Sequence, residues 1–164
     1  MPTYASEGEK KEFVQVTAGT HQAVCYDIWD IGKQTTPFTD EDGDPIVQHK
    51  VVLGFEINEL MTEGQFKGKR KTLNKFYTLS LGEKATLRKD LEGWRGQAFT
   101  KEELKKYDID NLLGSNCMVS VVLNEKGKAK ISTISKLMNG LPMLAPENER
   151  SSPKWITDMR SKAI

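Results

Sequence analysis

The chain has 164 residues, of which 37% are hydrophobic and 29% charged, and its 24 lysines and arginines nearly balance 23 aspartates and glutamates. These values are typical of a soluble globular domain, and no apolar run approaches the roughly 18 residues that a membrane-spanning helix needs. The first 13 residues lack the apolar core of a signal peptide. We therefore expect a single domain with polar ends, located in the cytoplasm and with no membrane contact.

The first half of the chain predicts three strands. Residues 1–13 are polar, and we expect them to be flexible. Residues 19–31 are rich in aromatic and branched side chains, and both alternating sets are apolar, which favours a strand covered on both faces. A turn-rich acidic loop follows. Residues 48–57 then alternate, with Val51, Leu53, Phe55 and Ile57 expected to face inward, and a third strand is predicted over about residues 71–79.

Two helices are predicted after the third strand. Ser80 and Glu83 have the spacing of a capping box, and apolar residues at helical spacing follow until Gly93, which we expect to end the helix. Thr100 and Glu103 have the same spacing and predict a second helix. Both helices therefore precede the last two strands.

The remaining elements predict the fold class. Residues 116–123 and 128–135 are apolar strand-like runs joined by "NEKG", which predicts a hairpin. Three strands, a helical insert and two strands is the order of a five-stranded OB-fold barrel, which binds single-stranded nucleic acid on strands two and three. We predict such an all-β domain over residues 14–138, with 139–164 as a polar C-terminal tail containing a short helix near Trp155. Another all-β barrel or sandwich topology stays open.

The most informative segment is "FKGKRKTLNKFY", residues 66–77. It carries five cations, three aromatic residues and no acid, so the rest of the chain has a net charge of about −4. A groove for single-stranded nucleic acid combines cations for phosphates with rings on which bases stack. The predicted nucleic-acid-binding residues are Lys50, Lys67, Lys69, Arg70, Lys71, Lys75, Phe76, Tyr77 and Trp29.

Alternation along the third strand separates two faces. Leu73, Tyr77 and Leu79 share the face expected to point inward, whereas Phe76 lies among polar residues on the other. Phe76 is therefore the predicted stacking platform, and Tyr77 reaches a base only if a bulge turns it outward. The outward Lys50 and Gly54 extend this surface, with Gly54 allowing a base or sugar to approach the backbone. Trp29 is either a second platform or part of the core.

Three runs also carry a resemblance to known proteins. The segments "AGTHQAVCYDIWDIG" (18–32), "SLGEKATLRKDLEGWRGQAFTKEEL" (80–104) and "LLGSNCMVSVV" (112–122) resemble a family of small proteins of tailed phages and prophages. The similarity covers roughly residues 12–137. It implies an OB-fold single-stranded DNA-binding protein that serves phage replication and recombination in the host cytoplasm, with replication or recombination proteins as partners.

One feature departs from this class. Proteins with this role typically end in an acidic tail that recruits partners, whereas residues 146–164 carry slightly more basic than acidic side chains. Recruitment through an acidic tip is therefore not expected, and the tail is instead predicted to add to DNA binding. The sequence leaves a homodimer open.

The sequence contains no motif that indicates catalysis. There is no nucleophile elbow, no phosphate-binding Walker loop and no Cys/His zinc pattern. Asp27 and Glu56 are the only acids considered for a nuclease site, and the acidic loop lacks the bidentate glutamate of a calcium loop. The two cysteines are expected to be small buried hydrophobes.

We therefore expect neither enzymatic activity nor a bound cofactor or metal. Two alternatives to simple DNA protection remain: a strand-annealing recombination accessory, and a protein-interaction module such as a phage inhibitor of a host enzyme.

Overall fold

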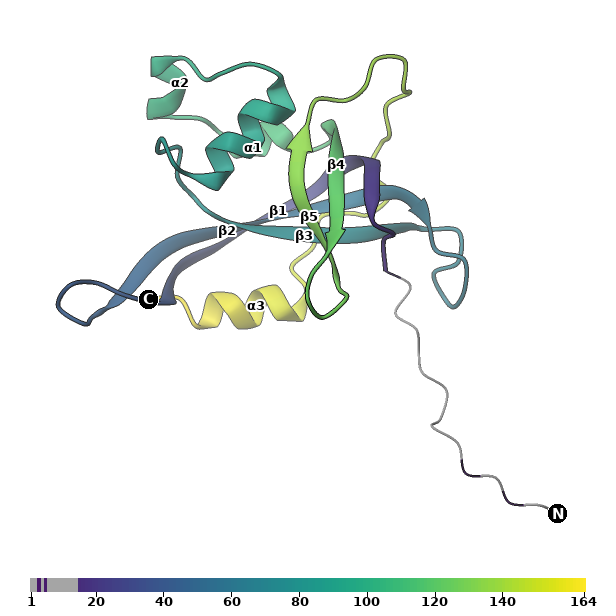
Figure 1. Ribbon diagram of the computed structural model, residues 1–164, viewed down its shortest axis with the longest axis horizontal. Helices are drawn as coiled ribbons and strands as arrows, with labels where there is room; N and C mark the ends of the chain where they lie inside the picture. The colour runs from purple at the N-terminus through teal and green to yellow at the C-terminus, as the bar shows by residue number, and fades with distance from the viewer. Residues whose placement is uncertain (1–2, 4, 6–14) are drawn as a thin grey trace.

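The computed structural model describes residues 3, 5 and 15–164 (Figure 1). The prediction that residues 1–13 are flexible therefore lies almost entirely outside the described residues. Five strands form one antiparallel sheet in the order β3-β2-β1-β4-β5. The strands are β1 (Gly19–Thr39), β2 (Pro45–Leu60), β3 (Arg70–Thr78), β4 (Asn116–Leu123) and β5 (Ala129–Ser135). The predicted five strands, with a helical insert between the third and fourth, are thus confirmed.

Strand β1 joins the two halves of the sheet, because its first residues pair with β4 and most of its length pairs with β2. A bulge shifts the β1–β2 register between Cys25 and Asp27. A bulge adds one residue and so exchanges the faces beyond it. Cys25 and Ile28 therefore both face the main core, whereas Trp29 belongs to a second apolar cluster.

The main core lies between the sheet and helix α1 (Thr86–Arg95). The alternating residues predicted for β2 are fully buried here, and the Phe55 ring packs against Trp94 with centroids 5.6 Å apart. Helix α2 (Lys101–Lys105) and the 3-10 helix η1 (Ile109–Leu112) complete the insert. Figure 1 shows α1 and α2 above the sheet and helix α3 (Lys154–Ser161) below it.

The capping predictions have different outcomes. Thr100 and Glu103 form the expected capping box of α2. The box predicted at Ser80 is wrong, because Ser80 Oγ instead accepts a hydrogen bond from the Gly82 N–H, and α1 begins six residues later. Gly93 also does not end α1; Gly96 does, with a left-handed φ of 72°. Gly93 instead allows close approach to β5, since a Cβ there would lie 2.5 Å from the Ile134 carbonyl oxygen.

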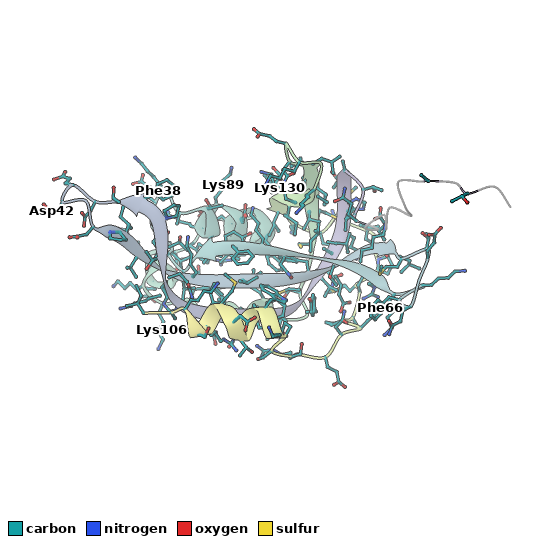
Figure 2. All side chains as sticks on the ribbon, turned by 90° about the horizontal axis from the view of Figure 1, so that it is seen from below. Phe38, Asp42, Phe66, Lys89, Lys106 and Lys130 are labelled. Carbon is teal, nitrogen blue, oxygen red and sulfur yellow. The ribbon has the colours of Figure 1, made fainter. Side chains whose placement is uncertain are left out.

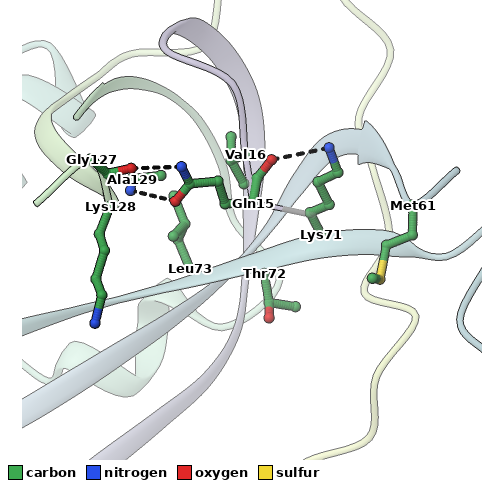
Figure 3. Close-up of a pocket in the computed structure, with 9 residues that line it drawn as sticks. All are labelled: Gln15, Val16, Met61, Lys71, Thr72, Leu73, Gly127, Lys128 and Ala129. Carbon is green, nitrogen blue, oxygen red and sulfur yellow. Dashed lines mark hydrogen bonds between the residues drawn. The ribbon is translucent and has the colours of Figure 1, made fainter. Parts of the chain in front are cut away.

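The sheet is not closed into a barrel, because β3 and β5 form its two edges. Gln15 lies between these two edges (Figure 3). Its side-chain amide donates to the Gly127 carbonyl and accepts from the Ala129 N–H. Its backbone carbonyl accepts a hydrogen bond from Lys71 Nζ. The Gln15 side chain thus takes up an N–H of β5 in place of a neighbouring strand. A cavity of about 660 Å³ remains beside it.

The C-terminal segment packs against the other face of the sheet. The short helix predicted near Trp155 is confirmed as α3, and its Ile156 is fully buried against Trp29, Ile31 and Val52. Residues 139–164 are therefore in contact with the sheet, although the sequence suggested a separate polar tail. Within the described residues, no helix is long and apolar enough to cross a membrane.

We predict that Gly93→Ala destabilises the fold even though alanine is the better helix former. The added methyl group overlaps a backbone oxygen that cannot rotate away, and overpacking of this kind costs about 1–3 kcal/mol. Urea unfolding of the variant beside Lys89→Ala, an exposed position on the same helix, provides the measurement. A Gly93→Ala protein as stable as the wild type would contradict this packing.

Candidate nucleic-acid interface

Strand β3 presents one polar face to solvent. Thr72, Asn74 and Phe76 are exposed on it, whereas Tyr77 is only 2% exposed and belongs to the main core. The predicted orientation of the strand is therefore confirmed. Phe76 is 49% exposed and is the one aromatic residue on this face of β3. We call the exposed surface of Thr72, Asn74 and Phe76 the β3 surface.

Tyr77 has a structural position. Its hydroxyl donates a 2.6 Å hydrogen bond to Asp90 of α1, a buried carboxylate. Burial, and then the nearby Asp90 charge, raise the pKa of this phenol well above its usual value. The Tyr77 ring therefore cannot act as a stacking platform in this fold.

Three of the five predicted cations in the basic segment are already ion-paired. Lys71 and Lys75 share the inward parity of Tyr77, and their ammonium groups lie 2.7 Å from Glu59 and 2.6 Å from Asp90. Arg70 faces the other way and lies 2.9 Å from Glu56. Alternation that predicts Tyr77 inside also predicts Lys71 and Lys75 inside, so the sequence already contained this signal.

The other predicted cations are more accessible. Lys67 and Lys69 lie exposed in the β2–β3 loop, and no carboxylate of the described residues is within ion-pair distance of either. Lys50 is half-buried and donates to the Thr78 hydroxyl. Lys50 and Phe76 line one cavity of about 530 Å³ at the end of β3, together with Lys84.

The hairpin between β4 and β5 contributes cations that the sequence reasoning missed. Lys126, Lys128 and Lys130 are all exposed in the run "NEKGKAK". Lys128 lines the cavity at the start of β3, together with Thr72 and Leu73 (Figure 3). Seen from below, β3 runs between α3 on one side and β4 and β5 on the other (Figure 2). The signal for these lysines was their alternation through a predicted turn that lies beside the ligand-binding strands in an OB fold.

Trp29 and Gly54 are not available to a ligand, so Trp29 belongs to the core, one of its two predicted roles, and the prediction for Gly54 is wrong. Trp29 is 3% exposed beneath the C-terminal segment, and its indole N–H donates to the Ser151 carbonyl. A Cβ on Gly54 would lie 2.9 Å from the Trp29 ring and 3.1 Å from that of Tyr26. Gly54 therefore makes room for two aromatic side chains of the protein itself.

The two acids considered for a nuclease site hold the C-terminal segment instead. Glu56 is fully buried, and its carboxylate accepts hydrogen bonds from the backbone N–H groups of Glu147 and Asn148 and from Arg70. Asp27 accepts from the Ser151 N–H and from Arg150. Among the residues that the structure describes, no cluster of three or more His, Cys, Asp or Glu side chains could hold a metal ion.

The pKa of Glu56 reflects these partners. Burial alone would raise it, but the N–H groups of Glu147 and Asn148, the Asn148 side chain and Arg70 favour the ionised form more strongly. The pKa of Glu56 is therefore held below its usual value. The C-terminal segment thus supplies most of the donors that keep this buried carboxylate ionised.

The cysteines are not part of the interface. Cys25 and Cys117 are both buried and form no disulfide, as expected. Burial raises the pKa of the Cys25 thiol to about 12, so it is protonated and unreactive at neutral pH.

A scan against models of known protein families finds no match for this chain, and a search of curated proteins finds no significant match either.

We predict that Glu56→Gln lowers the free energy of unfolding at pH 7 by about 3 kcal/mol, because an uncharged amide leaves Arg70 and several N–H donors poorly paired. Since the folded-state pKa is depressed, this contribution is complete above pH 4.5, the usual pKa, and is lost as the pH falls through the lower folded value. Urea unfolding of both proteins between pH 3 and pH 7 measures the difference. A difference that stays constant down to the lowest pH would contradict this role of Glu56.

Proposed function

We propose that this protein binds single-stranded DNA with little sequence preference, on the β3 surface. The observation that carries the proposal is Phe76, a half-exposed ring on an otherwise polar strand face. Exposed lysines of the β2–β3 loop and of the β4–β5 hairpin lie near the beginning of the same strand. Rings that stack on bases, beside cations that follow the phosphates, are the usual elements of such a site.

The fold supports the same proposal. Strand β1 pairs with both β2 and β4, and the helical insert lies between β3 and β4, as in an OB fold. We infer that the chain is an open member of that fold, in which β3 and β5 are not paired as strands but are linked by the hydrogen bond from Lys75 Nζ to the Ser132 carbonyl. The resemblance of its sequence motifs to phage proteins suggests a role in replication or recombination, with other proteins of those processes as partners.

A single strand fits this surface better than a duplex. Stacking on Phe76 needs a base whose face is free, and the bases of a duplex are already stacked on one another. The aromatic face is the same for every base, so a site of this kind tolerates different sequences. Arg70, Lys71 and Lys75 are already ion-paired with carboxylates. The site therefore has fewer cations for phosphates than the sequence suggested.

A protein-interaction role is the alternative, and the β1–β2 hairpin favours it. Phe38 is 68% exposed close to the acidic turn that contains Asp42, at the opposite end of the molecule from Phe66 (Figure 2). An exposed ring beside acids suits a basic protein partner better than DNA. This surface does not include Phe76, so variants separate the two functions.

We predict that Phe76→Ala weakens binding of a labelled oligothymidylate by about 1–3 kcal/mol, because a stacking surface is lost. Its effect on the melting temperature should be small, since half of the ring is already in water. Tyr77→Phe is the matched control: it loses the hydroxyl bond to Asp90 and should melt earlier while binding DNA normally. Fluorescence anisotropy with single-stranded and duplex DNA of equal length provides the affinities.

Two results would reject the proposal. One is a wild-type protein that prefers duplex or does not bind single strands at all. The other is a Phe76→Ala variant that binds as well as the wild type while Phe38→Ala abolishes capture of a protein partner.

The salt dependence tests the cations separately. If Lys67, Lys69, Lys126 and Lys128 each meet a phosphate, the slope of log K against log salt should be about −3, at roughly −0.7 per contact. Replacing Lys67 and Lys69 by alanine should make the slope shallower by about 1.4. Lys101→Ala with Lys106→Ala removes the same charge at and beside α2, on the other side of the sheet, and should leave the slope unchanged. Equal slopes for both double variants would show that the lysines of the β2–β3 loop do not contact the phosphates of the DNA.

A further inference from the structure

A second aromatic ring lies beside Phe76 and comes from the C-terminal segment. Trp155 of α3 is 37% exposed, and its ring centroid lies 6.1 Å from that of Phe76, with the planes tilted by 43°. Trp155 also contacts the buried Trp29 ring in an edge-type arrangement, with centroids 5.6 Å apart. The chain thus places two half-exposed rings side by side, one on a strand and one on a helix 79 positions later.

We propose that Trp155 is a second base-stacking platform, and that it and Phe76 take neighbouring bases of one unstacked strand. This inference rests on the proposed binding of single-stranded DNA and names the C-terminal segment as part of that site. The separation of the rings supports it. Bases stacked in a duplex strand follow one another at about 3.4 Å, whereas rings 6.1 Å apart suit bases that have been drawn apart.

The position of Trp155 is well defined by contacts that involve neither its ring nor DNA. Ile156 is fully buried in the cluster with Trp29, Ile31 and Val52. The Arg160 guanidinium donates to the Asp30 carbonyl, the Gln34 side chain donates to the Met159 carbonyl, and the Ile164 N–H donates to the Lys33 carbonyl, each at 2.9 Å. A platform held by such contacts needs little reorganisation when a base arrives.

Docking of α3 does not by itself explain two exposed rings. Ile156 supplies the buried anchor of the helix, and a smaller residue at position 155 would leave this anchor in place. The Trp155 ring contacts Trp29, yet more than one-third of the residue stays exposed. This exposed part adds a stacking surface at the edge of the β3 surface, where the sheet leaves Phe76 uncovered.

Intrinsic fluorescence tests the inference directly. The chain has three tryptophans, and Trp29 and Trp94 are buried, so Trp155 is the one that a base can reach. Oligothymidylate should quench the emission of the full-length protein, and Trp155→Phe should lose most of this quenching while keeping an affinity within about threefold of the wild type. Trp155→Ala should bind about 5- to 160-fold more weakly. Thr157→Ala, an exposed change on the same helix, should retain both affinity and quenching.

The outcomes separate this inference from the proposed function. If the wild type binds single strands and Phe76→Ala weakens binding, but Trp155→Ala binds normally, the second platform is wrong and the proposed function stands. Quenching that persists unchanged in Trp155→Phe would also overturn it, because the base would then lie near another tryptophan. If the wild type does not bind single strands at all, both fail. Circular dichroism and melting curves confirm that each variant is folded, and a Trp155→Ala protein that has lost α3 is replaced by Trp155→Leu, for which the same loss of affinity is expected.

Discussion

The arrangement of this molecule depends on a buried charge. Glu56 lies on β2 with no solvent exposure, and an ionised carboxylate there is stable only if hydrogen-bond donors surround it. Arg70 supplies one donor, and the backbone and side chain of the segment at Glu147 and Asn148 supply the others. Asp27 repeats this on β1 with Ser151 and Arg150. The last part of the chain is thereby held across the sheet, and Arg70 is held with it.

This constraint decides which surface stays open to a ligand. The C-terminal segment and α3 cover Trp29, Val52 and the neighbourhood of Gly54, so this part of the sheet has the packing of a core. The β3 surface stays open because α3 reaches only as far as the contact between Trp155 and Phe76. The C-terminal segment therefore covers Trp29 and Val52 and also places Trp155 beside Phe76 at the border of the β3 surface. The proposed DNA site is for this reason composed of residues distant in sequence: a strand, a hairpin and the final helix.

Alternation along the chain was sufficient to predict the inward faces of β2 and β3, but the other face of β2, with Val52, Gly54 and Glu56, is also buried because the C-terminal segment covers it. The exposed position of Phe76 and the buried position of Tyr77 follow from alternation. The inward position of Lys71 and Lys75 follows from it too, although their place in a basic segment led us to predict that they bind phosphate. Alternation failed for β1, where the bulge after Cys25 reverses the faces and places Trp29 under α3. The backbone partners of Glu56 could not be predicted from the sequence. They lie 91 and 92 residues later in the chain, in a polar segment with no pattern that pairs it with β2. The role of Gly93 was not predictable either. A glycine commonly ends a helix, and the contact with the Ile134 carbonyl that requires it here is made between elements distant in sequence.

The central claim is that a single strand of DNA lies along β3, between α3 and the β4–β5 hairpin. Amide chemical shifts of the ¹⁵N-labelled protein, recorded while an unlabelled oligothymidylate is added, test this claim residue by residue. The account predicts that the largest changes fall on residues 72–76, on residues 124–128 and on the first turn of α3 around Trp155. Changes confined to α1 and α2, or to the β1–β2 hairpin near Phe38, would contradict it.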